Sequence, residues 1–253
     1  MKINFPNLRL TICDLRIFPR EMVSRRSQIV NLNWPLILII LLGVALRLWL
    51  IGVSPLDPRF SNADDGDYYR RALRLAVTGQ YLDDTWLIRP PLHVFFFAFW
   101  LKCALLLGRP ELGVLFIKYA QTGLAALTIV LGYATARRIF ASDRTGLLFA
   151  AFLALWFSFV EQPTVLFSEL LYLFLFMLHM WLLARFDAGG RWYDLALAGL
   201  TLGAAALTRS PALYSLAFVV LWLFLRPQVA GRRSQDPRRR NCRQPCHGQR
   251  TLR

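Results

Sequence analysis

PLILIILLGVALRLWLIGV (Pro35–Val53) is an almost unbroken apolar run, and SNADDGDYY (Ser61–Tyr69) follows it after a short break. As a helix, the nineteen residues of the first stretch rise about 28 Å, enough to cross the hydrocarbon core of a bilayer. The second stretch holds three carboxylates and two phenols within six positions. An acidic cluster directly after a run of membrane length predicts a polar site at a membrane surface.

The composition predicts a membrane protein. The chain has 253 residues, of which 56% are hydrophobic, 14% are aromatic and only 18% are charged. A soluble domain of this length would not carry several near-continuous apolar runs. We therefore expect an all-α polytopic membrane protein with about six transmembrane helices and two juxtamembrane helices in its first external loop.

The net charge of +15 is concentrated at the two ends of the chain. Residues 1–33 hold six Lys and Arg against two acids, and residues 226–253 hold nine Arg against one Asp. This distribution indicates membrane topology and anionic lipid rather than nucleic acid. It divides the chain into a basic cytoplasmic segment (1–33), a transmembrane module (34–225) and an Arg-rich cytoplasmic tail (226–253) that we expect to be disordered.

The cysteines predict neither a disulfide framework nor a metal site. Of the four, Cys242 and Cys246 precede His247, but no second pair of ligands accompanies them. No cofactor is certain from the sequence, and a divalent cation remains an open alternative.

Residues 54–111 predict an external loop with two surface helices. Ser61 or Asn62 can cap the first helix, and acidic residues suit its first turn. The second helix, Leu92–Leu107, is placed on the surface because a membrane crossing here would put Arg137 and Arg138 outside, against the positive-inside rule.

The remaining spans place further polar residues beside the acidic cluster. They are Leu112–Ala136, Thr145–Val160, Thr164–Ala184, Tyr193–Thr208 and Pro211–Leu225. Together with Pro35–Val53 they give six spans with both termini cytoplasmic. In this arrangement Glu161, Glu169, Thr208 and Arg209 lie at the outer face, so polar groups converge on one side of the membrane.

Each of these charges also has a structural interpretation. Glu169 suits the start of a helix, and Asp64 and Asp65 can complement a helix dipole. Arg47 and Arg209 can extend their guanidinium groups to the interface from helix ends. It is improbable that all of these costly charges lie on one face by accident. We therefore favour a functional site over the structural interpretations.

A lipid phosphate fits such a site chemically. Its tail stays in the bilayer while a cation near the outer leaflet (Arg209, Arg47 or Lys118) holds the phosphate and stabilises it as it leaves. A nearby carboxylate takes the proton of an acceptor hydroxyl as general base. For Lys118, a structural partner is the alternative, and His93 is expected to be packed rather than catalytic.

The order of short motifs along residues 34–225 carries a resemblance. The motifs are Asp64-Asp65-Gly66-Asp67-Tyr68, Gly79-Gln80-Tyr81, Arg89-Pro90-Pro91-Leu92, Arg137-Arg138-Ile139-Phe140, Ser168-Glu169 and Leu207-Thr208-Arg209. In this order the chain resembles the amino-terminal half of the GT-C membrane glycosyltransferases that use polyprenyl-phosphate sugars. It is most similar to the protein O-mannosyltransferase-like and aminoarabinose-transferase-like group.

The resemblance implies inverting sugar transfer on the outer face, with an acidic residue of the first external loop as catalytic base. That base matches Asp64, the neighbouring acidic position matches Asp65, and Asp67 is a less favoured substitute. The acidic residue after the third span matches Glu169, and the cation near the lipid phosphate matches Arg209.

The complete prediction adds Tyr68, Arg89, Lys118 and Arg47 to the substrate-binding residues. The predicted partners are a polyprenyl-phosphate sugar donor, an acceptor of unknown kind (protein, glycan or lipid) and membrane lipid, without nucleic acid. The predicted location is a bacterial inner membrane, with the active site facing outward.

Two further expectations concern the chain as a whole. Members of this group are usually longer, so we expect a truncated or frame-shifted product, which can be inactive alone. The alternative to an enzyme is a non-catalytic membrane scaffold or a fragment of a transporter, although no internal repeat supports a transporter.

Overall fold

The computed structural model describes residues 33–55, 63–81 and 90–234, and every regular element in these ranges is a helix. The elements are α1 (Trp34–Val53), α2 (Ala63–Thr78), α3 (Pro91–Leu106), η4 (Pro110–Leu112), α4 (Gly113–Phe140), α5 (Asp143–Leu155), α6 (Phe157–Glu161), η5 (Gln162–Thr164), α7 (Glu169–Asp187), α8 (Trp192–Ala206) and α9 (Ala212–Ser234). The all-α class is confirmed. The chain divides after Ala212 into two compact units, and most of α9 belongs to the second.

Among the residues that the structure describes, three helical segments are long and apolar enough to cross a membrane: α1, Pro110–Phe140 (η4 with α4) and α7. A fourth crossing arises if α5 and the segment Phe157–Thr164, which bend by 60° relative to each other, cross as one unit. The chain is thus an integral, multi-pass membrane protein. The six predicted spans are not all shown by length and composition, because α8 and the apolar part of α9 (Ala212–Leu225) are shorter.

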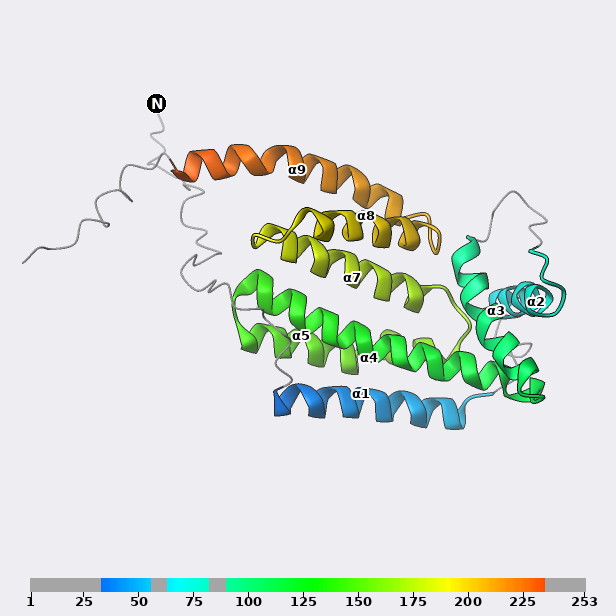
Figure 1. The fold of residues 1–253 in the computed structure, drawn as a ribbon. Helices are drawn as coiled ribbons and strands as arrows, with labels where there is room; N and C mark the ends of the chain where they lie inside the picture. Colours follow the sequence, from blue (N-terminus) through cyan, green and yellow to red (C-terminus); the bar gives the residue numbers. More distant parts are fainter. Residues whose placement is uncertain (1–32, 56–62, 82–89, 235–253) are drawn as a thin grey trace, which may run out of the picture. The chain divides into compact units, whose positions relative to one another are not determined.

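Within the first unit, α1, α4, α5, α7 and α8 lie side by side, and the chain reverses direction from each to the next (Figure 1). α4 is central, since it contacts α1, α3, α5 and α7. Its Tyr133 and Ile129 form a buried core with Leu153 of α5. Gly132 permits the close approach, because a Cβ there would lie 2.5 Å from Leu153 Cδ1 and 3.0 Å from the Phe149 ring.

Arg47 of α1 lies fully buried beside the bend between α5 and α6. Its Nη2 donates to the carbonyl oxygens of Leu153 and Phe159, each at 3.2 Å. Its Nη1 donates to Ala154 at 3.2 Å and to Gly43 in its own helix at 2.8 Å. Carbonyls at the end of a helix lack partners within that helix, and Arg47 supplies donors for those of α5. The guanidinium is enclosed, so Arg47 does not extend to the interface.

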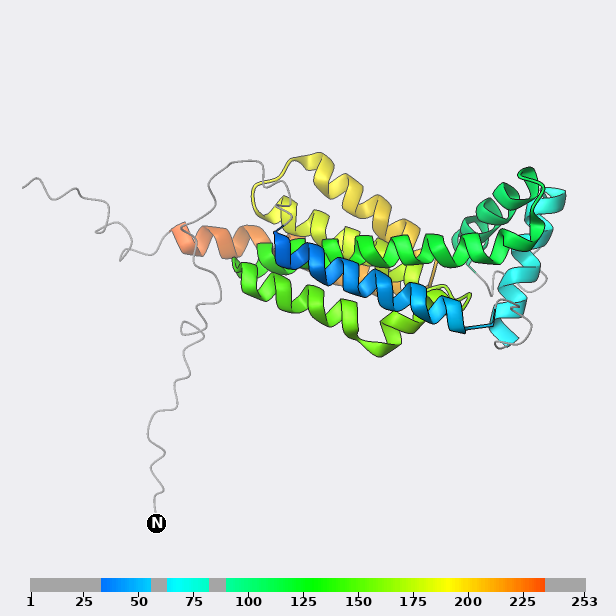
Figure 2. The same cartoon turned by 90° about the horizontal axis from the view of Figure 1, so that it is seen from below.

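α2 and α3 lie across the end of the aligned helices at which α1 ends and α4 begins, as Figures 1 and 2 show from two directions. Ala72 of α2, Phe97 of α3 and Ile117 of α4 share one buried apolar cluster. The N–H of Leu92 donates to the carbonyl oxygen of Leu207 at 3.1 Å, which joins the start of α3 to the end of α8. This arrangement agrees with two surface helices, whose position at a membrane stays a prediction.

Two predicted boundaries differ from the structure. The span Thr145–Val160 is two helices, because Trp156 adopts an extended backbone (φ −63°, ψ 117°) where Arg47 takes up the carbonyls of the bend. α9 continues to Ser234, past the predicted end at Leu225, although Pro227 and Gly231 lie in this extension. The rest of the predicted tail, 235–253, lies outside the described residues.

Candidate active site

A pocket of about 360 Å³ lies at the end of the first unit where α2, α3 and α7 begin and α8 ends. Four predicted site residues line it: Asp64, Tyr68, Glu169 and Arg209. The other lining residues are Pro90, Phe167, Ser168, Thr208, Ser210 and Pro211. The structure thus gathers two carboxylates, a guanidinium and a phenol from three separate segments.

A larger cavity, of about 520 Å³, lies between the end of α1 and the start of α4. The described residues that line it carry no charged side chain and are Leu48, Ile51, Gly52, Ser54, Leu115 and Tyr119. We place the chemistry in the smaller pocket because, of these two cavities, it is the one whose described lining brings acidic and basic groups together.

Glu169 and Arg209 form an ion pair with a hydrogen bond from Arg209 Nη1 to Glu169 Oε1. Glu169 is the first residue of α7, where a carboxylate complements the helix dipole. Arg209 follows α8, and its backbone N–H donates to Ala205 at 2.8 Å. The Glu169 side chain is 41% exposed and the Arg209 side chain is 37% exposed, so both can contact a ligand in the pocket.

Asp64 and Tyr68 lie one turn apart on α2, which puts both on the face toward the pocket. Asp64 is exposed, whereas Tyr68 is buried and packs edge-on against His93 with 4.8 Å between ring centroids. Burial, with a smaller effect from the charge of Arg209, lowers the pKa of His93 to about 3. His93 is therefore a neutral, packed side chain at pH 7, as predicted.

Asp65 and Lys118 lie buried beside the pocket and are absent from its described lining. Lys118 Nζ donates to the carbonyl oxygen of Pro55 at 2.9 Å, and its ammonium is attracted by the carboxylate of Asp65. These contacts tie α4 to the start of α2 and to the chain after α1. They support the structural alternative for Lys118, and they leave Asp64 as the acidic residue of the pair that faces the pocket.

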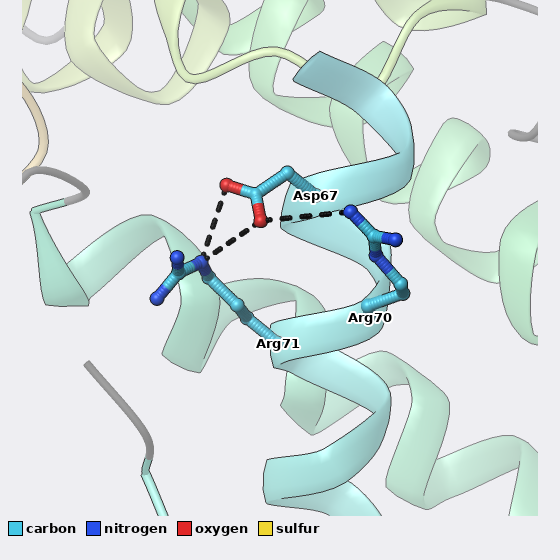
Figure 3. Close-up of polar contacts among 3 residues, drawn as sticks. All are labelled: Asp67, Arg70 and Arg71. Atoms are coloured by element: carbon cyan, nitrogen blue, oxygen red, sulfur yellow. Dashed lines mark hydrogen bonds and ion pairs between the residues drawn. The ribbon is translucent and has the colours of Figure 1, made fainter. Parts of the chain in front are cut away.

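Asp67 points into an ion pair within its own helix (Figure 3). Both of its carboxylate oxygens accept from Arg71 Nε at 3.2 Å, and Arg70 Nη2 lies 4.0 Å from Oδ1. Asp67 is not among the described residues that line the pocket. Its last place among the three aspartates agrees with this geometry.

The other predicted residues contribute little to this pocket in the part of the chain that the structure describes. Arg47 is committed to the α5–α6 bend, and Arg89 lies outside the described residues. Among the described residues, no group of three or more His, Cys, Asp and Glu side chains could hold a metal ion. A divalent cation therefore has no ready-made set of ligands there.

The sequence analysis did not single out Ser210. It named Ser168 only as part of a motif and Thr208 as one of the polar residues at the outer face. All three line the pocket, and Thr208 is fully buried with its hydroxyl donating to the carbonyl oxygen of Ala204 at 3.0 Å. The available signal was position, because each of the three is a neighbour of Glu169 or Arg209 in the sequence.

This fold and this pocket define a multi-pass helical membrane protein with a charged site at one end of its helices. A family model described as dolichyl-phosphate-mannose-protein mannosyltransferase matches residues 89–236, which are 148 of the 253 residues. The chain belongs to this family, and the resemblance noted from its motifs is confirmed. Membership implies transfer of a sugar from a lipid phosphate. No curated protein and no solved structure gives a significant match.

The matched region covers part of the pocket. It includes Glu169 and Arg209, whereas Asp64 and Tyr68 precede it. The family match therefore supports the part of the pocket formed by Glu169 and Arg209, and the part formed by Asp64 and Tyr68 rests on the geometry alone.

Proposed function

We propose that the chain transfers a sugar from a polyprenyl-phosphate donor to an acceptor hydroxyl in the pocket of α2, α7 and α8. The observation that carries this proposal is the shared lining by Asp64, Glu169 and Arg209. Charged groups near a bilayer are costly, and a cluster of them at one pocket indicates a functional site. The family match supplies the chemical class of the donor.

In the proposed reaction the acceptor oxygen attacks the anomeric carbon of the sugar. The bond from that carbon to the phosphate oxygen breaks, and the polyprenyl phosphate leaves with the electron pair. The acceptor proton passes to the carboxylate of Asp64 as general base. The guanidinium of Arg209 stabilises the negative charge that develops on the phosphate.

Glu169 has a positioning role in this scheme. Its ion pair holds Arg209 at the pocket before the donor binds. A guanidinium has five N–H donors, so Arg209 can keep one contact with Glu169 while it donates others to a phosphate. Tyr68, fixed against His93, forms the wall between Asp64 and the packed interior.

We further propose that the pocket faces outward from a plasma membrane of bacterial type, with six spans and both termini cytoplasmic. The positive-inside rule supports this orientation, since Arg137, Arg138 and Arg185 lie in the last turns of α4 and α7, at the end opposite the pocket. Single cysteines at Leu106 and Ser142 test it with an impermeant thiol reagent. Labelling of both from the same side would contradict the topology.

The test of function uses the full chain in lipid nanodiscs with radiolabelled dolichyl-phosphate mannose and a crude membrane extract as acceptor source. Asp64→Asn removes the base but keeps the shape, and it is expected to slow release of dolichyl phosphate about 10²- to 10⁴-fold. Arg209→Gln is expected to weaken donor binding roughly 10- to 100-fold, the equivalent of a lost charge-assisted hydrogen bond.

Two matched variants complete this design. Asp67→Asn changes the same charge on the same helix away from the pocket, and it should retain transfer. Asp65→Asn, compared with Asp64→Asn, shows which of the two neighbouring carboxylates is needed for transfer. Full transfer by both the Asp64 and the Asp65 variant would reject the catalytic assignment and favour a non-catalytic membrane protein.

A further inference from the structure

Arginines lie at the ends of α4, α7 and α8. These helix ends are opposite the end at which α2 and α3 lie (Figure 1). Arg137 and Arg138 lie in the last turn of α4, Arg185 lies in the last turn of α7, and Arg191 immediately precedes α8. The segments 137–144 and 185–194 together hold five arginines and three aspartates. This end therefore carries an excess of two positive charges.

Two of these arginines are held by aspartates. Arg137 Nε lies 2.5 Å from Asp143 Oδ1, and Arg185 Nη2 lies 3.0 Å from Asp194 Oδ1. The Asp194 side chain is only 3% exposed, and its other oxygen accepts from the N–H of Arg191 at 3.1 Å. Both carboxylates are thus already engaged.

Arg138 differs from these two. It is half-buried, and no carboxylate among the described residues forms an ion pair with it. Arg137 adjoins it in the last turn of α4, and Arg185 lies in the last turn of α7, which packs along α4. Both like charges disfavour the charge of Arg138, and Asp194, already bound to Arg185, offsets only part of that effect. Like charges in a partly desolvated place are unfavourable, and a bound anion would relieve the repulsion.

Aromatic side chains mark the level at which such an anion would lie. The Arg185 guanidinium lies 4.8 Å from the Trp181 ring centroid, and that of Arg191 lies 5.8 Å from the Tyr193 ring centroid. Trp192 is 78% exposed at the start of α8. Trp and Tyr side chains with adjacent cations are typical of the headgroup level of a bilayer. The anion expected there is a lipid phosphate.

We propose that Arg138 and Arg185 bind the phosphate of an anionic glycerophospholipid between the carboxyl ends of α4 and α7. Trp181 and Trp192 flank the headgroup, and its acyl chains lie along the apolar surfaces of the helices. The site is separate from the sugar-transfer pocket, so it does not depend on the proposed function. Basic sites between transmembrane helices are a known means of lipid recognition.

Native mass spectrometry of the full chain, titrated with phosphatidylglycerol or phosphatidylcholine, tests this site. We expect phosphatidylglycerol to bind more tightly than phosphatidylcholine. Arg138→Gln should weaken phosphatidylglycerol binding roughly tenfold, through loss of one charge-assisted hydrogen bond. Arg138→Lys, which keeps the charge, should retain most of the preference and serves if the glutamine variant does not fold.

Arg109→Gln is the matched control, because it removes the same charge from a side chain that is 68% exposed at the other end of the unit. Equal losses in the Arg109 and Arg138 variants would overturn the proposal in favour of diffuse attraction. Loss of binding in Arg209→Gln alone would place the lipid in the pocket instead. Competition by millimolar inorganic phosphate would assign the arginines to a soluble anion and would also overturn it.

Discussion

Replacement of Arg47 by Met tests whether this buried arginine stabilises the α5–α6 bend. Met keeps a long side chain but has no donor for the carbonyls of Leu153, Ala154 and Phe159. These three acceptors lie on segments that meet α1 from elsewhere in the chain. The variant therefore loses cross-helix hydrogen bonds without a large change in volume.

The magnitude follows from two opposing effects. Each buried carbonyl left without a donor costs about 1–3 kcal/mol, which would give up to about 9 kcal/mol for three. Removal of a buried charge also removes its own desolvation cost, so the net loss is smaller than this sum. With that cost subtracted, we expect a net loss of about 3–5 kcal/mol for Arg47→Met, roughly half of the upper sum.

Thermal unfolding in detergent or nanodiscs measures this loss. For a protein of this length, 1 kcal/mol corresponds to a shift in Tm of about 2–4 °C, so the expected decrease is roughly 6–20 °C. Arg70→Met, at a side chain that is 78% exposed, is the control and should change Tm by little. An unchanged Tm for Arg47→Met, together with weaker donor binding, would refute the structural role and restore the phosphate-binding interpretation.

Three further predictions follow from buried contacts. Gly132→Ala should lower stability by about 1–3 kcal/mol because its Cβ meets Leu153 of α5, whereas Gly123→Ala, with nothing within 4 Å of its Cβ, should be neutral or stabilising in thermal unfolding. The pKa of His93 is about 3 in the folded chain and about 6.5 in the unfolded chain, so the unfolded chain binds the proton first as the pH falls. Stability should therefore decrease as the pH decreases from about 6.5 toward 3. His93→Leu should remove the part of the pH dependence of Tm that is due to this histidine. Lys118→Met should lower Tm and expose the start of α2 to proteolysis, and an unaltered digestion pattern would count against its tethering role.

The fold class and the convergence of polar groups could be predicted from the sequence, since both follow from local patterns. Apolar runs of membrane length impose helices, because a backbone in lipid must satisfy its own hydrogen bonds. Alternation of these runs, with arginines at one end, predicts that Glu169 and Arg209 lie on the same side of the membrane as Asp64. The structure brings all three to one pocket.

The helix break inside Thr145–Val160 could not be predicted in this way. No proline or glycine marks Trp156, and the apolar pattern continues through it. At the bend the carbonyl oxygens accept hydrogen bonds from Arg47, which lies more than a hundred residues earlier in the chain. A side chain this distant leaves no trace in the local pattern.

The roles of the charged residues likewise depend partly on local sequence and partly on tertiary contacts. By itself, the sequence determined that costly charges occur in this chain and on which side of the membrane they should gather, because those facts depend on composition and spacing. Only the tertiary structure distinguished Asp64, which lines the pocket, from Asp65, which is buried. It likewise distinguished Arg209, at the pocket, from Lys118, which donates to the carbonyl oxygen of Pro55. Whether a charge is available to a ligand depends on its neighbours in space, and those are set by how the helices pack.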